Sequence, residues 1–156
     1  MALWLKYPNP FSKHVLAGDV ICRSVDSLGR LCTTRVILKT SAIPAWISHW
    51  IKSNEAFVVE ESVVDPRAGT MVTITKNLNH QKMMTVEEVQ TYTRSPDNRS
   101  WTLIETQARF NCNFGWLGLA GRLESLGAKK FKDHLQRSKD ALAYVLERIC
   151  KSDRVS

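Results

Sequence analysis

Short runs of alternating apolar and polar residues fill most of the chain up to Cys112. Residues 20–25 lead into Asp26-Ser27-Leu28-Gly29 and then into residues 31–39. Alternation with a period of two is typical of strands, and Asp and Gly between two such runs indicate a hairpin turn. Four more runs follow at residues 57–64, 71–78, 85–93 and 101–112. We therefore expect about six strands in an antiparallel meander, beginning near Asp19 and apolar on one side.

The pattern changes after Gly115. Apolar residues now recur at three- and four-residue steps, at Leu119, Leu123, Leu126, Leu135, Leu142, Val145, Leu146 and Ile149. This spacing predicts an amphipathic helix over residues 122–150. Strands followed by a helix indicate an α+β fold, in which a curved antiparallel sheet wraps on one long C-terminal helix that covers its apolar face. Such an arrangement can enclose a cavity, and we expect a ligand in it.

Residues 43–52 interrupt the strands and are too long and too apolar for a plain turn. In a helical conformation Trp46 and Trp50 would share one face, and so would Ile47 and Ile51. A short segment that carries tryptophan is suited to a membrane interface or to closing an apolar pocket. We interpret it as a lid, and the alternative is a loop that packs its tryptophans into the core.

The length of 156 residues predicts one domain over residues 1–156, and no apolar run approaches a membrane span. The net charge is +7 and the sequence pI is about 9.4. This balance favours an anionic partner, which could be nucleic acid, a membrane surface, an acidic protein or a phosphorylated ligand. The sign of the charge does not choose among them.

The four cysteines form no C-x-x-C pair and have no histidines at zinc-finger spacing. We therefore expect no structural metal. Cys22 and Cys32 flank the first turn, and unpaired thiols are favoured there over a bridge.

No catalytic motif stands out. The sequence contains no G-x-S-x-G, no H-E-x-x-H and no phosphate-cradling glycine loop, and its four histidines follow no ligand spacing. Glu60 and Glu61 are adjacent on one strand, and Glu87 and Glu88 on another, so the two members of each pair point to opposite faces. We expect no catalytic residues, no cofactor and no enzymatic activity.

The basic residues are more informative. Arg35 and Lys39 lie four apart on one strand and share a face, and Lys130 and Arg137 lie seven apart on the predicted helix and share a face there. A phosphate head group requires two or three convergent donors, and its tails require an apolar chamber. The alternative is a basic helix face in contact with solvent.

Several motifs occur in a fixed order that resembles the PRELI/MSF1 family. The motifs are Lys6-Tyr7-Pro8-Asn9-Pro10-Phe11-Ser12-Lys13-His14-Val15-Leu16, Arg35 with Lys39, Pro44-Ala45-Trp46, Glu61-Ser62-Val63-Val64-Asp65-Pro66, Asn77-Leu78-Asn79-His80, Val86-Glu87-Glu88 and Lys130-Phe131. The resemblance extends over about residues 6–150, and it is much more specific than any one of these motifs.

The resemblance implies a curved antiparallel sheet closed by a long C-terminal helix around a phospholipid cavity. Members of the family carry phospholipids between the mitochondrial outer and inner membranes, through the intermembrane space. They act together with a small helical-hairpin protein that has twin C-x9-C motifs. One branch carries phosphatidic acid for cardiolipin synthesis, and a sister branch carries phosphatidylserine. Residues 12–16 and 77–80 look more like the phosphatidic-acid branch.

The resemblance also implies roles for individual residues. Lys39 would meet the lipid phosphate, with His14 and Arg35 near it and with Lys130 and Arg137 supplying cations from the helix. The lid would comprise Ile43, Pro44, Trp46, Ile47, Trp50 and Ile51. Positive charge would bring the protein to an anionic membrane surface. The lipid would enter once the lid opens.

The chain departs from the family at its start. Family members usually begin with a strand and a helix ahead of the Tyr7-Pro8-Asn9-Pro10 motif, and we expect this domain to lack both. A form that binds protein without carrying lipid is therefore one alternative function. A basic nucleic-acid-binding module is another, but it predicts exposed aromatic residues interleaved with cations. Trp46 and Trp50 instead lie among isoleucines, so no nucleic-acid partner is expected.

Overall fold

A computed structural model describes residues 10, 13–40, 54–82, 84–112, 125, 133, 136–137 and 139–147. The predicted lid at residues 43–51 lies outside these ranges. The same holds for Lys130, for the start of the first family motif and for much of the predicted helix.

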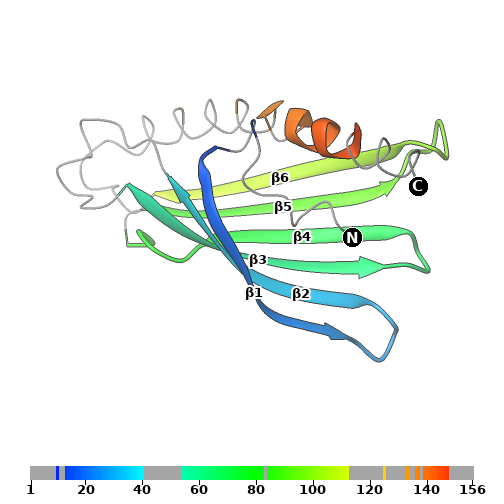
Figure 1. Ribbon diagram of the computed structural model, residues 1–156, viewed down its shortest axis with the longest axis horizontal. Coiled ribbons are helices and arrows are strands. Elements are labelled where there is room, and N and C mark those ends of the chain that lie inside the picture. The colour runs from blue at the N-terminus through cyan, green and yellow to red at the C-terminus, as the bar shows by residue number, and fades with distance from the viewer. Residues whose placement is uncertain are drawn as a thin grey trace.

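Six strands form one antiparallel sheet in which each strand pairs with its neighbours in the sequence (Figure 1). The strands are β1 (Val15–Val25), β2 (Leu31–Thr40), β3 (Glu55–Asp65), β4 (Thr70–Asn77), β5 (Met84–Arg94) and β6 (Thr102–Cys112). The sheet is strongly twisted and curved. The predicted meander is confirmed, and most of its strand ends lie within two residues of those expected.

The first strand begins earlier than expected, at Val15 and not near Asp19. Val15 pairs with Lys39, and register shifts follow between Val15 and Ala17 and between Val20 and Cys22. Each such bulge inserts an extra residue and breaks the two-residue alternation of the strand. The start of β1 therefore had no clear period in the sequence.

Aspartates organise two of the turns. Asp26 Oδ1 accepts hydrogen bonds from the backbone N–H groups of Leu28, at 3.0 Å, and Arg30, at 2.9 Å. Gly29 in this turn has a φ of 78°, a conformation that glycine adopts without a steric penalty. Asp65 Oδ1 accepts from Arg67 N and Ala68 N in the same way between β3 and β4. The predicted turn after β1 is confirmed.

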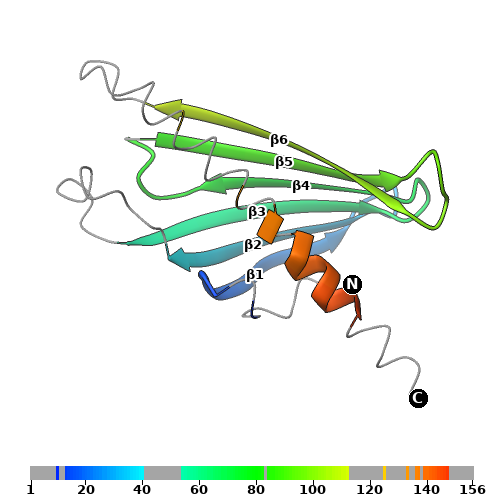
Figure 2. The same cartoon turned by 90° about the horizontal axis from the view of Figure 1, so that it is seen from above.

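Alternate residues of β2 show which face of the sheet is covered. Thr33, Arg35 and Ile37 are buried, with 5%, 9% and 7% of their surface exposed, whereas their neighbours along the strand are only half-buried. We call the side that carries these three residues the inner face and the opposite side the outer face. A C-terminal helix, described at residues 139–147, lies on one side of the sheet (Figures 1 and 2). Since burial is concentrated on one face, the helix covers the inner face.

The inner face is more polar than expected. An apolar cluster of Val15, Ile37 and Val58 forms one part of it. The prediction that the covered face would be the apolar one is wrong for β4, because Thr73 is buried whereas Val72 and Ile74 on the outer face are only half-buried.

The inner position of Thr73 follows from the register. Thr73 lies opposite Ser62, and Ser62 lies opposite Thr33, so three polar residues form one row on the inner face. Ser62 Oγ donates a hydrogen bond to Thr33 O at 3.4 Å. Hydroxyl groups can be buried in this way because they find backbone partners within the sheet.

The C-terminal helix buries a narrow stripe. Ala141 and Val145, one turn apart, are each 5% exposed, and Leu142 is half-buried. Leu146, which the periodicity placed on a wider apolar stripe, is 43% exposed. The length of the helix stays a prediction, since most of residues 122–138 lie outside the described ranges. In the described part of the chain no helix is both long and apolar enough to cross a membrane.

Cys22 and Cys32 are both free thiols, as the sequence favoured. Cys22 lies opposite Thr34, and Cys32 lies opposite Ser24, so the two cysteines are diagonal neighbours. Diagonal positions lie about 7–8 Å apart, which is beyond the usual span of a disulfide. The hairpin register therefore keeps the thiols apart.

Candidate functional site

One row of side chains crosses the inner face from β2 to β5. Arg35 pairs in register with Glu60, Glu60 with Thr75, and Thr75 with Glu88. Lys39 lies four residues beyond Arg35 on the same strand and therefore on the same face. We call Arg35, Lys39, Glu60 and Glu88 the inner charge cluster. It brings together two cations and two carboxyl groups.

Arg35 and Glu60 form a buried ion pair. Arg35 Nε lies 3.1 Å from Glu60 Oε1, and the two side chains are only 11% and 6% exposed. Removing two charges from water is costly, and their attraction offsets this cost only when both stay in place. The intact pair therefore adds little net stability, but the loss of either partner would leave a buried charge unpaired.

Lys39 lies in a desolvated environment. Loss of hydration lowers the pKa of its ammonium group, and the carboxyl groups of Glu88 and then Glu60 oppose this shift. Its side chain nevertheless keeps some exposed surface, and within the described ranges it forms no ion pair shorter than 4.0 Å. A poorly hydrated cation of this kind can gain much from an incoming anion.

The two carboxyl groups of the cluster are also perturbed. Burial raises the pKa of Glu60, and the charges of Arg35 and Lys39 only partly offset the effect. Burial also raises the pKa of Glu88, where Lys39 and a hydrogen bond from Gln90 act in the opposite direction. Both carboxyl groups are thus easier to protonate than ordinary glutamates.

A hydrogen-bond chain fixes Glu88 from its own strand. Tyr92 OH donates to Gln90 Oε1 at 2.6 Å, and Gln90 Nε2 donates to Glu88 Oε1 at 2.7 Å. The three residues are spaced by two along β5, so they lie on the same inner face. Tyr92 orients the Gln90 amide, and the amide in turn directs its N–H group to the carboxyl group of Glu88.

His14 borders the cluster at the start of β1. Its carbonyl oxygen accepts a hydrogen bond from Thr40 N at 2.7 Å, and Val15 pairs with Lys39. The described contact ties the backbone of His14 to the end of β2 beside Lys39. The half-buried position of its side chain is compatible with the expected place near the phosphate site, but its role stays a prediction.

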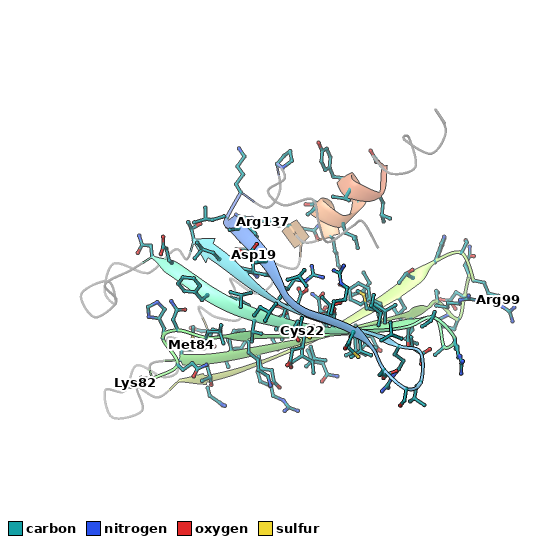
Figure 3. All side chains as sticks on the ribbon, turned by 60° about the horizontal axis from the view of Figure 1, so that its bottom comes forward. Asp19, Cys22, Lys82, Met84, Arg99 and Arg137 are labelled. Atoms are coloured by element: carbon teal, nitrogen blue, oxygen red, sulfur yellow. The ribbon has the colours of Figure 1, made fainter. Side chains whose placement is uncertain are left out.

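The motif at residues 77–80 has a structural function. Asn77 Nδ2 donates to Asn79 O at 2.7 Å and Met84 O at 3.0 Å, and Asn77 Oδ1 accepts from Val86 N at 2.8 Å. These bonds close the connection between β4 and β5. The connection lies at the end of the sheet that Lys82 and Met84 mark, opposite the end with Arg99 (Figure 3).

The same motif anchors the start of β3. Asn79 Nδ2 donates to Glu55 O at 2.8 Å, and Asn79 Oδ1 accepts from Phe57 N at 3.0 Å. His80, whose φ is 60°, has its Nε2 atom 3.3 Å from the same Glu55 oxygen. Glu55 follows closely after the predicted lid. The motif therefore provides a fixed attachment for the C-terminal end of that segment.

The other two cations of the predicted site are Arg137 and Lys130. Arg137 is described and exposed, and it lies on the helical segment above the sheet (Figure 3). Lys130 lies outside the described residues, so its proximity to Arg137 and to the sheet stays a prediction. Arg35 and Lys39 share the inner face, as expected.

The sequence reasoning missed the carboxyl half of the site. Glu60 and Glu88 were recognised only as members of pairs that point to opposite faces. That geometry is correct, because Glu60 is buried whereas Glu61 is exposed. Placing Arg35, Glu60 and Glu88 in one row requires the strand register. Counting back from each predicted turn would have provided it.

Taken together, the meander, the covering helix and a desolvated charge cluster define an α+β protein with charged and polar groups on the covered face of its sheet. The sequence model of the PRELI-like family matches residues 1–152. The chain therefore belongs to the PRELI-like family.

Curated relatives agree with this assignment. The chain is 36% identical over 151 residues to PRELI domain-containing protein 1, mitochondrial, of Gallus gallus, and the aligned region covers 95% of this chain and 69% of that protein. It is 35% identical over 149 residues to Protein UPS1, mitochondrial, of Saccharomyces cerevisiae, with 95% and 84% covered. The Schizosaccharomyces pombe Protein ups1 homolog is 37% identical over 145 residues, with 92% and 84% covered.

Proposed function

We propose that the protein is a phospholipid carrier that moves phosphatidic acid between the mitochondrial outer and inner membranes, through the intermembrane space, and so supports cardiolipin synthesis. Membership of the PRELI-like family and the word "mitochondrial" in the names of its relatives support this proposal. The single observation that carries it is the desolvated ammonium group of Lys39 on the covered face of the sheet.

The lipid phosphate pairs with Lys39 in this proposal. A phosphate gains more from a cation that has already lost its water than from an exposed one, because the surroundings screen the interaction less. Arg35 is less available than Lys39, since Glu60 already forms a buried ion pair with it. No bond of the lipid is made or broken, so the activity is transfer and not catalysis.

The family resemblance supplies the remaining parts of the proposal. Residues 43–51 act as the lid, positive charge brings the protein to an anionic membrane, and a small hairpin protein with twin C-x9-C motifs is the partner. The anchoring of Glu55 by Asn79 supports a lid with one fixed end. Such an attachment allows a segment to move without disturbing the sheet beyond it.

Vesicle-to-vesicle transfer of fluorescent phosphatidic acid and phosphatidylserine tests the proposal, with the protein produced together with its hairpin partner. We expect faster transfer of phosphatidic acid. Lys39→Gln should reduce its rate about tenfold or more, because a charge-assisted contact is worth about 1.5–3 kcal/mol. The matched control is Lys76→Gln, which removes an exposed cation from the outer face and should leave the rate near that of the unaltered protein.

Three outcomes would contradict the proposal. Faster transfer of phosphatidylserine would assign the protein to the other head group. Equal loss in both variants would show that overall charge matters and that the Lys39 position does not. No transfer of either lipid by a folded complex would favour a form that binds protein only.

A further inference from the structure

The inner charge cluster contains equal numbers of cations and carboxyl groups before any ligand binds. Arg35 on β2, Glu60 on β3 and Glu88 on β5 lie in one row of the inner face. Lys39 lies on the same face four residues beyond Arg35, where burial lowers the pKa of its ammonium group and Glu88 and Glu60 are near enough to oppose this shift. The corresponding position of β4 carries Thr75, and that of β6 carries Ala108, so neither strand adds a charge to this row. At its described residues 136–137 and 139–147 the covering helix buries Ala141 and Val145. In these ranges Asp140 and Tyr144 are half-buried titratable residues, whereas Arg137 and Lys139 are exposed.

Glu88 is the member of the cluster best placed to respond to a ligand. Glu60 is 5% exposed and paired with Arg35, whereas Glu88 is half-buried and electrostatically coupled to Lys39. Gln90 occupies Oε1 of Glu88 at 2.7 Å. A proton on this carboxyl group would therefore reside on Oε2, directed by the Tyr92–Gln90 chain.

A phosphate monoester would upset the charge balance of the cluster. It carries close to two negative charges near neutral pH and has three strong acceptor oxygens, whereas a phosphodiester carries one charge. Among the four groups of the inner charge cluster, placing this charge next to Lys39 leaves an excess of negative charge unless a proton is taken up. Burial already raises the pKa of Glu88, so its carboxylate is a ready acceptor for that proton.

We propose that Glu88 is a head-group contact that binds a phosphate monoester in its protonated form, with one proton taken from solvent onto Oε2 and donated as a hydrogen bond to a phosphoryl oxygen. Gln90 and Tyr92 act as positioning residues for this carboxyl group. The inference rests on the proposed function and adds its selectivity: a phosphodiester gains less, because it brings less charge for the proton to offset. Lys39 and Glu88 would then contact one phosphoryl group from strands β2 and β5.

Calorimetric titration in two buffers with different heats of ionisation tests this proposal. The probe is dihexanoylphosphatidic acid, added to the full chain in complex with its hairpin partner near pH 7. The expected uptake is about one proton per lipid bound, so affinity should fall by up to about tenfold per unit rise in pH. Dihexanoylphosphatidylserine should bind with less uptake.

The decisive variant is Glu88→Gln. The amide imitates the protonated carboxyl group, so we expect phosphatidic acid to bind at least as tightly as before, with proton uptake close to zero. Glu87→Gln is the matched control, because the neighbouring carboxylate lies on the outer face beside Lys76. It should leave proton uptake unchanged. Tyr92→Phe keeps Glu88 but releases Gln90, and it should weaken binding of phosphatidic acid more than that of phosphatidylserine.

Unchanged proton uptake in Glu88→Gln would overturn the inference, because the proton would then reside on the phosphate or elsewhere. Selective loss of phosphatidylserine binding in that variant would also overturn it, since Glu88 would then pair with an ammonium group. Glycerol 3-phosphate separates two sources of the same chemistry. If only phosphatidic acid causes Glu88-dependent proton uptake, the site recognises a lipid head group. If glycerol 3-phosphate causes it as well, the site recognises the phosphoryl group itself. Either result supports the inference.

Failure of this inference can be distinguished from failure of the proposed function. If the unaltered protein neither binds nor transfers either lipid, both proposals are contradicted. The unaltered protein could instead bind phosphatidic acid, and Lys39→Gln could abolish its transfer, while Glu88→Gln takes up the same number of protons as the unaltered protein. In that case only the role of Glu88 is contradicted.

Discussion

The two faces of the sheet each hold an ion pair at the same distance, and the two pairs have very different consequences. On the inner face, Arg35 Nε lies 3.1 Å from Glu60 Oε1, with both side chains almost fully buried. On the outer face, Lys76 Nζ also lies 3.1 Å from Glu87 Oε2, but the side chains are 48% and 34% exposed. Arg109 joins Glu87 from β6 at 3.9 Å and is 81% exposed.

The difference shows that distance alone does not measure an ion pair. Water screens the outer pair, so its members can separate at little cost. The inner pair has lost that screening, so each charge depends on the other. Alternation along β5 assigns these two environments to Glu87 and Glu88, which are adjacent in the sequence. Glu87 forms a solvent-exposed pair on the outer face, and Glu88 lies in the candidate site.

The largest expected effect comes from removing one charge of the inner pair. Arg35→Met or Glu60→Met alone should lower the free energy of unfolding by about 3–5 kcal/mol, because an unpaired charge stays buried. The double variant should recover most of this loss, since neither charge then remains. Urea unfolding followed by circular dichroism measures all four proteins. Additive losses in the double variant would mean that the two residues stabilise the sheet independently.

The pH dependence of stability should also separate the faces. Between the reference pKa of 4.5 and its raised folded value, each of Glu60 and Glu88 binds more protons in the folded state than in the unfolded state. Their contribution to stability is fully present below pH 4.5 and is lost as pH rises through the folded value. Glu88→Gln should therefore make this decline shallower, as seen in thermal unfolding across a pH series.

The titration of Lys39 limits the pH range of this test. Lys39, with its lowered pKa, acts at the alkaline end, where the unfolded state binds more protons and stability rises toward pH 10.5. The comparison is therefore best made on the acidic side. Glu87→Gln serves as the outer control, and an equally shallow decline in that variant would argue against a difference between the faces.

The smallest effect belongs to the outer pair. Lys76→Ala, Glu87→Ala and the double variant should give a coupling energy of about 0.2–1 kcal/mol, because exposed pairs are weak. High salt should remove most of this coupling, whereas the inner pair should keep its own. A double-mutant cycle at low and high salt measures both. A coupling above that range that resists salt would show that the outer face is less hydrated than its exposure indicates.

The sequence predicted the sheet well because its signals are local. Alternating runs and turn residues such as Asp26 and Gly29 depend on neighbours in the chain, and the six strands followed from them. The bulges in β1 were the exception, because an inserted residue removes the period that the prediction relies on.

The site was predicted only in part because its geometry is not local. Arg35 and Lys39 lie on one strand, so their shared face could be inferred from spacing alone. Glu60 and Glu88 belong to other strands, and their place beside these cations depends on register. The covered face was mistaken at β4 for a related reason. The hydrophobic pattern predicts which residues share a face, but the register decides which face is covered, and it places Thr73 opposite the buried Ser62.

The strictly sequential order of the strands has a consequence for how the protein folds. Each pairing closes a loop between neighbours in the chain, and short loops close at low entropic cost. Four of the five connections are short, and only β2 and β3 are joined by a long one, at residues 41–54. Pairing of β2 with β3 therefore has the highest loop-closure cost of the five, and we expect the sheet to form its buried Arg35–Glu60 pair later than its other strand pairings.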